Sequence, residues 1–180
     1  MALQQEYEQL KQQISQYDKA GDYVGLAREM DRFLELTGEL YGLESPEYAT
    51  TLNDYGGIHR DIGNFEKAEQ AFLQAAEKIA VLQSAQHPDY GSVLNNLAGL
   101  YRLMKDYEKA EAYFQKTLEI YKQALGEDHF LYISGGYKRN LFIANIRLDV
   151  IFDSSFVSAP RTLSHSELHI ILHPLVEPFT

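Results

Sequence analysis

The chain has 180 residues, of which 45% are hydrophobic, and its formal net charge is −10. A strong acidic excess argues against a nucleic-acid backbone or an anionic membrane surface as partner. The chain contains no cysteine, which excludes disulfides, thiolate zinc sites and cysteine nucleophiles and fits a reducing, cytoplasmic compartment. The opening MALQQEYEQL is polar, so we do not expect a signal peptide, and no run approaches the roughly 20 apolar residues of a membrane span.

A pattern of residues recurs after 42 positions, without a gap. The matching pairs are Pro46 and Pro88, Tyr48 and Tyr90, Leu52 and Leu94, Asn53 and Asn95, Gly57 and Gly99, Arg60 and Arg102, and Phe72 and Phe114. A fixed period of this length indicates a repeat solenoid. Neighbouring units must stack in such a fold, because one unit alone cannot bury its apolar face.

The first unit, residues 3–44, is a degenerate copy of this pattern. Leu10 matches Leu52 and Gly21 matches Gly63, but the helix expected at about 3–17 is rich in Gln and Lys. Terminal repeats are often atypical because their outer face meets water. We therefore interpret this unit as a cap.

The second unit, residues 45–86, opens with a favoured N-cap and first helical residue, Ser45 and Pro46. Its first helix carries Gly56 and Gly57, and each glycine costs roughly 1 kcal/mol against Ala within a helix. Two explanations stay open. Either the glycines allow close approach of two helices, or they form a smooth patch on which the backbone of a ligand lies.

The third unit, residues 87–128, is the clearest copy and predicts two helices. The apolar residues of 89–103 and of 107–125 fall at spacings of three and four, as on one face of a helix. These residues are Tyr90, Val93, Leu94, Leu97 and Tyr101 in the first segment and Ala110, Phe114, Leu118, Tyr121 and Leu125 in the second. Gly126 ends the unit as a residue that readily takes positive φ.

The pattern indicates a fourth unit that begins at His129 but stops after residue 134. We therefore expect residues 135–180 to be a non-repeat tail. The stretch at 140–152 is apolar and partly alternating, which predicts a strand. Three explanations of the tail stay open: a fold-back cap or disordered end, a dimerisation element, or an end foreign to the family, as a shifted reading frame would produce.

The residues of the third unit resemble a known family. Leu94, Leu97, Ala98, Tyr101, Ala110 and Phe114 stand where the tetratricopeptide repeat has its signature large and small residues. With HPDY, LNNLA and ALGEDH, and with 42 residues instead of 34, the unit resembles the long-repeat subtype of kinesin light chains and many bacterial proteins. Over about residues 3–134 this resemblance implies an all-α, right-handed solenoid of three helix pairs.

Little in the chain indicates chemistry. His165, His169 and His173 would share a helix face, but Pro174 follows and no nearby carboxylate completes a metal site, so chance spacing is the simpler explanation. There is no phosphate-binding glycine loop and no nucleophile elbow. We therefore expect no enzyme activity, no cofactor and no metal. The shared repeat position of His87 and His129 indicates a structural role at the turn between repeats.

What remains is the surface of the first helices, which line the concave side of a stacked helix-pair array and suit a peptide. The candidate groove residues are polar or small and lie off the apolar stripe. They are Lys11, Thr50, Asn53, Asp54, Gly57, Arg60, Ser92, Asn95, Asn96, Gly99 and Arg102.

These side chains suit a peptide because amides both donate and accept hydrogen bonds, while arginine binds carboxylates bidentately. The alternative is that Asn53 and Asn95 only tie helices together. The family resemblance implies groove-lining roles for Asn95 and Asn96. The carboxylate clamp of chaperone-binding tetratricopeptide domains is matched at Lys11 but not at its other positions, Ser15, Asp54, Ser92 and Asn96.

The sequence thus predicts a non-catalytic scaffold for protein–protein interaction that holds a peptide segment of a partner in its groove. The alternative function is self-association through the terminal repeat face or the tail, giving a homo-oligomer. An enzyme using the tail histidines ranks third. Residues 1–20 are too short for the coiled coil by which a light chain would join a motor.

Overall fold

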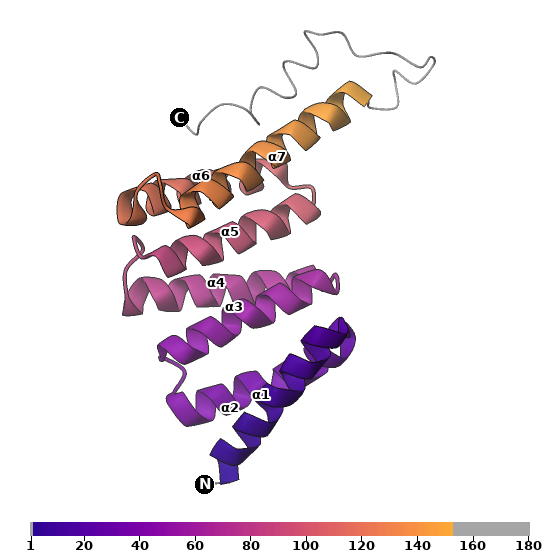
Figure 1. The fold of residues 1–180 in the computed structure, drawn as a ribbon, viewed down its shortest axis with the longest axis vertical. Helices are drawn as coiled ribbons and strands as arrows, with labels where there is room; N and C mark the ends of the chain where they lie inside the picture. The colour runs from indigo at the N-terminus through magenta and orange to yellow at the C-terminus, as the bar shows by residue number, and fades with distance from the viewer. Residues whose placement is uncertain (1, 153–180) are drawn as a thin grey trace.

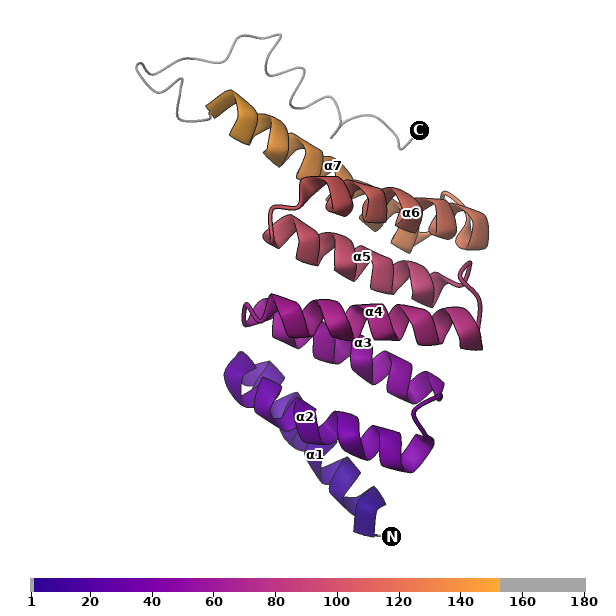
Figure 2. The same cartoon turned by 180° about the vertical axis from the view of Figure 1, so that it is seen from behind.

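The computed structural model describes residues 2–152, with side chains up to Ala144. That part of the chain is entirely helical between its turns, which confirms the all-α repeat fold. The helices are α1 (Ala2–Ala20), α2 (Tyr23–Tyr41), α3 (Pro46–Asp61), α4 (Phe65–Leu82), α5 (Pro88–Leu103), α6 (Tyr107–Leu125) and α7 (Phe130–Phe152). They stack in two layers, with α1, α3, α5 and α7 in one and α2, α4 and α6 in the other (Figures 1 and 2).

The turn inside each repeat is built by the same register position. Asp22, Asn64 and Asp106 cap the second helices, and each side chain accepts a hydrogen bond from the backbone N–H three residues on. A cap of this kind pairs one of the N–H groups that a helix start leaves without a partner. The period of 42 residues therefore fixes where every second helix begins.

The first helices are capped by a different set. Ser45 accepts from the backbone N–H of Tyr48, and the Nδ1 atom of His87 accepts from that of Asp89. The Nδ1 atom of His129 likewise accepts from the N–H of Leu131 at 3.2 Å. The structural role predicted for these two histidines is confirmed.

The main hydrophobic core runs through the second and third repeats and reaches α7. Phe72, Leu97 and Ala98 are fully buried in it, and Phe142 of α7 is 2% exposed. The first repeat keeps a smaller core of its own around Tyr7, Leu10 and Leu36. This separation is consistent with the interpretation of the first repeat as a cap.

The strand predicted at 140–152 is wrong, because α7 continues through Phe152. The helix starts at the fourth copy of the capping position, and its Phe142 ring packs against Phe114 of α6, with ring centroids 5.5 Å apart. A short apolar run does not distinguish helix from strand by periodicity, and packing on α6 decides for helix. The assignment of 135–180 as a separate tail stays a prediction: residues 135–152 belong to α7, and residues 153–180, with His165, His169 and His173, lie outside the described part.

Candidate functional site

A first hollow of about 930 Å³ lies between α1 and α3, on the layer of the first helices. Its floor is apolar and comes from α2, through Leu26, Met30 and Phe33. The candidate residues of α1 and α3 form its sides. They are Lys11, Thr50, Asn53, Asp54, Gly57 and Arg60.

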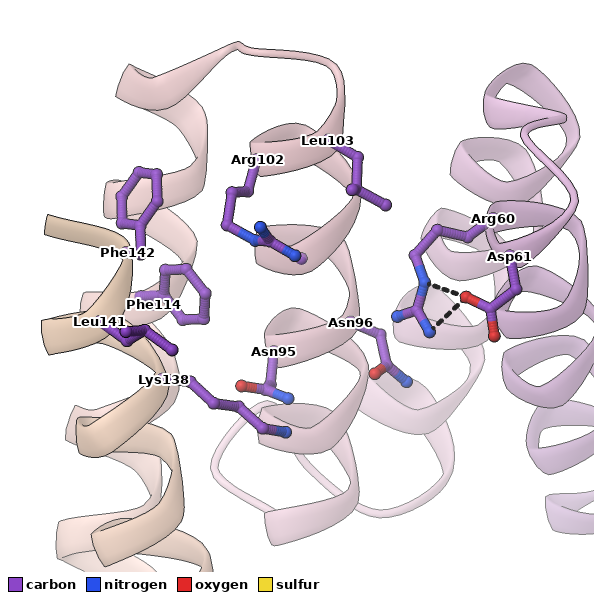
Figure 3. Close-up of a pocket in the computed structure, with 11 residues that line it drawn as sticks. Arg60, Asp61, Asn95, Asn96, Arg102, Leu103, Phe114, Lys138, Leu141 and Phe142 are labelled. Carbon is purple, nitrogen blue, oxygen red and sulfur yellow. Dashed lines mark hydrogen bonds and ion pairs between the residues drawn. The ribbon is translucent and has the colours of Figure 1, made fainter. Parts of the chain in front are cut away.

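A second hollow of about 440 Å³ adjoins the first and lies between α3, α5 and α7 (Figure 3). Arg60, Asp61 and Asn96 line both hollows, so the two form one continuous surface. The second hollow adds three further candidates of α5, which are Asn95, Gly99 and Arg102.

Ser92 is the one candidate that lines neither hollow. Its hydroxyl lies 3.0 Å from the hydroxyl of Tyr121 on α6 and donates to the carbonyl oxygen of Pro88. Ser92 therefore ties α5 to α6. In contrast, Lys138, Leu141 and Phe142 of α7 line the second hollow and were not predicted. The period gives a signal for two of them, since Lys138 stands in register with Asn96, and Leu141 with Gly99.

Asn95 and Asn96, the two asparagines that follow Leu94 in the third repeat, differ in their hydrogen bonding. The Nδ2 atom of Asn96 donates to Oδ1 of Asn53 at 2.9 Å, which links α5 to α3. The alternative interpretation, that Asn53 ties helices together, is therefore supported. The Oδ1 atom of Asn95 is buried and has no hydrogen-bond partner in the described part of the chain. A buried amide oxygen usually has a partner, so Asn95 has unused capacity to accept a hydrogen bond.

Positive charge gathers in the second hollow although the protein as a whole is acidic. Arg60 is paired with Asp61, its neighbour, at 2.8 Å. Arg102 and Lys138 are exposed and form no ion pair within residues 2–144. Figure 3 shows the Arg102 side chain extending from α5 on the side of Arg60. The hollow therefore holds two cations without a counter-charge.

Asp54 gives the first hollow a different electrostatic character. Desolvation raises the pKa of its carboxyl group above the ordinary value, and a hydrogen bond from the Asn53 side chain opposes that rise. Asp54 as a whole residue is exposed. The rise in pKa therefore comes from the position of its carboxyl group beside the helices. A carboxyl group in this position is a ready acceptor for a donor on a ligand.

The paired glycines of α3 have separate explanations. A Cβ atom on Gly56 would lie 2.7 Å from the Phe72 ring, so this glycine allows the close approach of α4. A Cβ atom on Gly57 would have no atom within 4 Å, and Gly57 lines the first hollow. Close packing thus accounts for Gly56, whereas the smooth-patch explanation for Gly57 stays a prediction.

His59 is a buried polar residue that the sequence analysis did not single out. It is 4% exposed, and neither ring nitrogen has a hydrogen-bond partner in the described residues. Its ring lies 4.3 Å from that of Tyr55, centroid to centroid. Burial lowers the pKa of His59, the charge of Lys67 lowers it further, and Asp31 opposes both. The imidazole is thus held neutral at the junction of α2, α3 and α4.

Within the described residues, no group of three or more His, Asp or Glu side chains is placed to hold a metal ion. None of the helices described is long and apolar enough to cross a membrane.

The comparisons with known proteins agree with this geometry. Models of the tetratricopeptide repeat family match residues 49–77 and 91–131, which confirms the family resemblance of the second and third repeats. No curated protein matches the chain in sequence.

Solved structures share the fold at low identity. The crystal structure of BtubC (BKLC) from P. vanneervenii is 24% identical with a TM-score of 0.61, and the match covers 84% of this chain and 66% of that one, just under two thirds of its length. Nearly identical TPR-like repeats of the kinesin light chain type from Podosopora anserina are 13% identical with a TM-score of 0.67, covering 93% and 82%. These likenesses show the α-solenoid fold.

Proposed function

Because this chain is a tetratricopeptide-repeat protein, we propose that it is a non-catalytic scaffold that binds a peptide segment of a protein partner along its concave layer. One observation carries the proposal. Candidate residues from α1, α3 and α5 converge on two adjoining hollows that share Arg60, Asp61 and Asn96. Extended concave surfaces of this kind are what stacked helix pairs offer to a peptide.

The second hollow supplies the polar contacts for the peptide. Asn95 lines this hollow, and a turn of its amide group brings the unpartnered Oδ1 atom, which is buried in the free protein, to a peptide N–H. The hydrogen bond removes the cost of leaving a buried acceptor unpaired. The exposed guanidinium group of Arg102 binds a carboxylate in the same segment. Neither contact requires an existing hydrogen bond or ion pair to break.

The first hollow supplies apolar contact. Its floor of Leu26, Met30 and Phe33 is set between polar sides, so it receives an apolar side chain of the same peptide. The proposed ligand therefore combines an apolar side chain with a carboxylate, spaced so that one lies over α2 and the other against α5.

The proposal is tested by a peptide-library selection on the full chain, beside a variant with Asn95→Ala and Arg102→Ala. The matched control is Arg28→Ala, because Arg28 is an exposed arginine on α2, in the other layer. We expect a shared motif with the wild-type chain and the control, and at least about tenfold weaker binding of that motif by the double variant, since hydrogen bonds to charged groups are strong.

Two results would contradict the proposal. One is the absence of any enriched motif with the wild-type chain. The other is equal enrichment by all three proteins, which would place the contact outside the hollows.

A further inference from the structure

The last described helix has an exposed apolar face. Phe130, Ile133 and Tyr137 lie at spacings of three and four on α7, and their exposed fractions are 75%, 47% and 59%. Residues at these spacings share one side of a helix. We call these three residues the end face. Solvated apolar side chains in such a group often mark an interface.

The repeat register shows what this face meets in a preceding repeat. Ile133 is in register with Gly91 of α5, where a Cβ atom would lie 2.8 Å from the Tyr121 ring of α6. Tyr137 is in register with Asn95, which lies on the hollow between α5 and α7. In the third repeat, these two positions of α5 therefore face the helices that follow in the stack. On α7 the described residues place no helix against them.

Within residues 2–152, no second helix follows α7 at the repeat position. Residues 104–106 form the turn between α5 and α6, and their equivalents in α7 are residues 146–148. Those residues lie inside α7, which runs on to Phe152. A helix that begins at residue 149, in register with α6, is therefore excluded.

The charges around the end face suit a second copy of the chain. Residues 130–137 carry no charged side chain, whereas the protein as a whole carries −10. Two copies therefore approach with little repulsion at this face. Asp128 lies before α7, and Lys138 follows the end face, and neither forms an ion pair within residues 2–144.

We propose that two copies of this chain associate through the end face, with their α7 helices antiparallel about a two-fold axis near Ile133. Antiparallel packing about that point brings residue 138 of one copy close to residue 128 of the other. Lys138 of each copy therefore lies near Asp128 of its partner copy, and symmetry makes this contact twice. The association does not depend on peptide binding, although Lys138 also lines the second hollow.

The proposal is tested by sedimentation equilibrium of the full chain over a wide concentration range. We expect a monomer–dimer equilibrium, which Ile133→Asp weakens about thirtyfold or more, as for a central apolar contact. The matched control is Val81→Asp, because Val81 is 78% exposed but lies on α4. We expect Val81→Asp to leave the dissociation constant of the dimer unchanged. Circular dichroism melts confirm that both variants fold.

A charge exchange separates this interface from any other. Lys138→Glu and Asp128→Lys each weaken the dimer about threefold to tenfold, and the double variant restores it, because the pair is exchanged in both halves. A wild-type chain that stays monomeric overturns the proposal. So does a dimer that Ile133→Asp and Val81→Asp affect equally, or one that the double charge variant fails to restore.

Discussion

The gap between α1 and α3 and the gap between α3 and α5 are equivalent in the repeat but are closed differently. In the second gap, Asn96 donates to Asn53 at 2.9 Å. The register equivalents in the first gap are Asp54 and Lys11, which have opposite charges, and no ion pair joins them. There the hollow of about 930 Å³ opens over α2. Two neutral amides hold two helices together where two exposed residues of opposite charge do not.

One register position thus serves two purposes. An ion pair between exposed side chains gains little, because ordering two long side chains costs entropy and salt screens their attraction. A pair of amides loses less solvation and forms a directed hydrogen bond. The first gap thus stays open to a ligand, while the second is braced.

The largest effect is expected from the core beneath the braced gap. Phe72 is fully buried, so Phe72→Ala leaves a cavity and lowers the free energy of unfolding by about 3–5 kcal/mol. Phe33 is the half-buried phenylalanine in the floor of the first hollow, where the register equivalent of Phe72 is the buried Met30. We expect Phe33→Ala to cost less than half as much in urea denaturation. Equal losses would contradict the contrast between the two gaps.

The two glycines of α3 give the next largest effect. Gly56→Ala places a methyl group 2.7 Å from the Phe72 ring, and we expect a loss of about 1–3 kcal/mol from overpacking. Gly57→Ala is the control, because no atom lies within 4 Å of the added Cβ and alanine favours the helix by up to about 1 kcal/mol. Thermal melts of the two variants should therefore shift in opposite directions. A Gly56→Ala variant that melts at the same or a higher temperature than the wild-type chain would show that Gly56 is not required for packing.

The pH dependence of stability sharpens the comparison at another register position. His59 corresponds to Tyr101 of α5, which donates its hydroxyl to Glu69, whereas His59 has no partner within the described residues. Because the folded state lowers the pKa of His59, the unfolded chain binds more protons as pH falls below about 6.5. Stability therefore decreases as pH falls through that value, by at most about 1.4 kcal/mol per pH unit for one proton.

Urea denaturation between pH 5 and 7.5, taken as about the range in which histidine titrates, measures this slope. We expect His59→Phe to remove part of this slope, because the substitution removes the buried imidazole. If the His59→Phe slope equals that of the wild-type chain, the buried imidazole is not the group that titrates.

The smallest effect concerns the asparagine brace itself. Asn96→Ala removes the hydrogen bond to Asn53 and should cost about 0.5–1.5 kcal/mol. The reciprocal change, Lys11→Asn with Asp54→Asn, copies the amide pair into the open gap. We expect a favourable coupling energy between these two substitutions, similar in size to the loss caused by Asn96→Ala. A double-mutant cycle measures this coupling. No coupling would mean that helix spacing, and not side-chain chemistry, keeps the first gap open.

The sequence predicted the repeat and most of the residues that line the two hollows, because both follow the period of 42 residues. It placed Asn53, Arg60 and Arg102 on one layer, since they recur on the same face of the first helices. It did not predict that Ser92 turns toward Tyr121, because a small hydroxyl at the edge of a stripe can face either way.

The sequence analysis did not predict that α7 lines the second hollow, or that residues 140–152 are helical, for a different reason. In α7 the register positions of LNNLA hold other residues, so the apolar alternation of 140–152 dominated the prediction. The helix follows instead from long-range packing of Phe142 on α6, which no local pattern encodes. Lys138 and Leu141 entered the second hollow with that helix.

The most direct test of the central claim is a nitrogen-15 NMR titration of the full chain with the peptide enriched in the selection. The account predicts saturable shifts of the Gly57 and Gly99 amides with one dissociation constant, because these glycines line the two hollows. The Gly25 amide, buried on α2, should stay in place as the internal control. Shifts confined to α2, α4 and α6, or to the end face of α7, would contradict the claim that this layer holds the peptide.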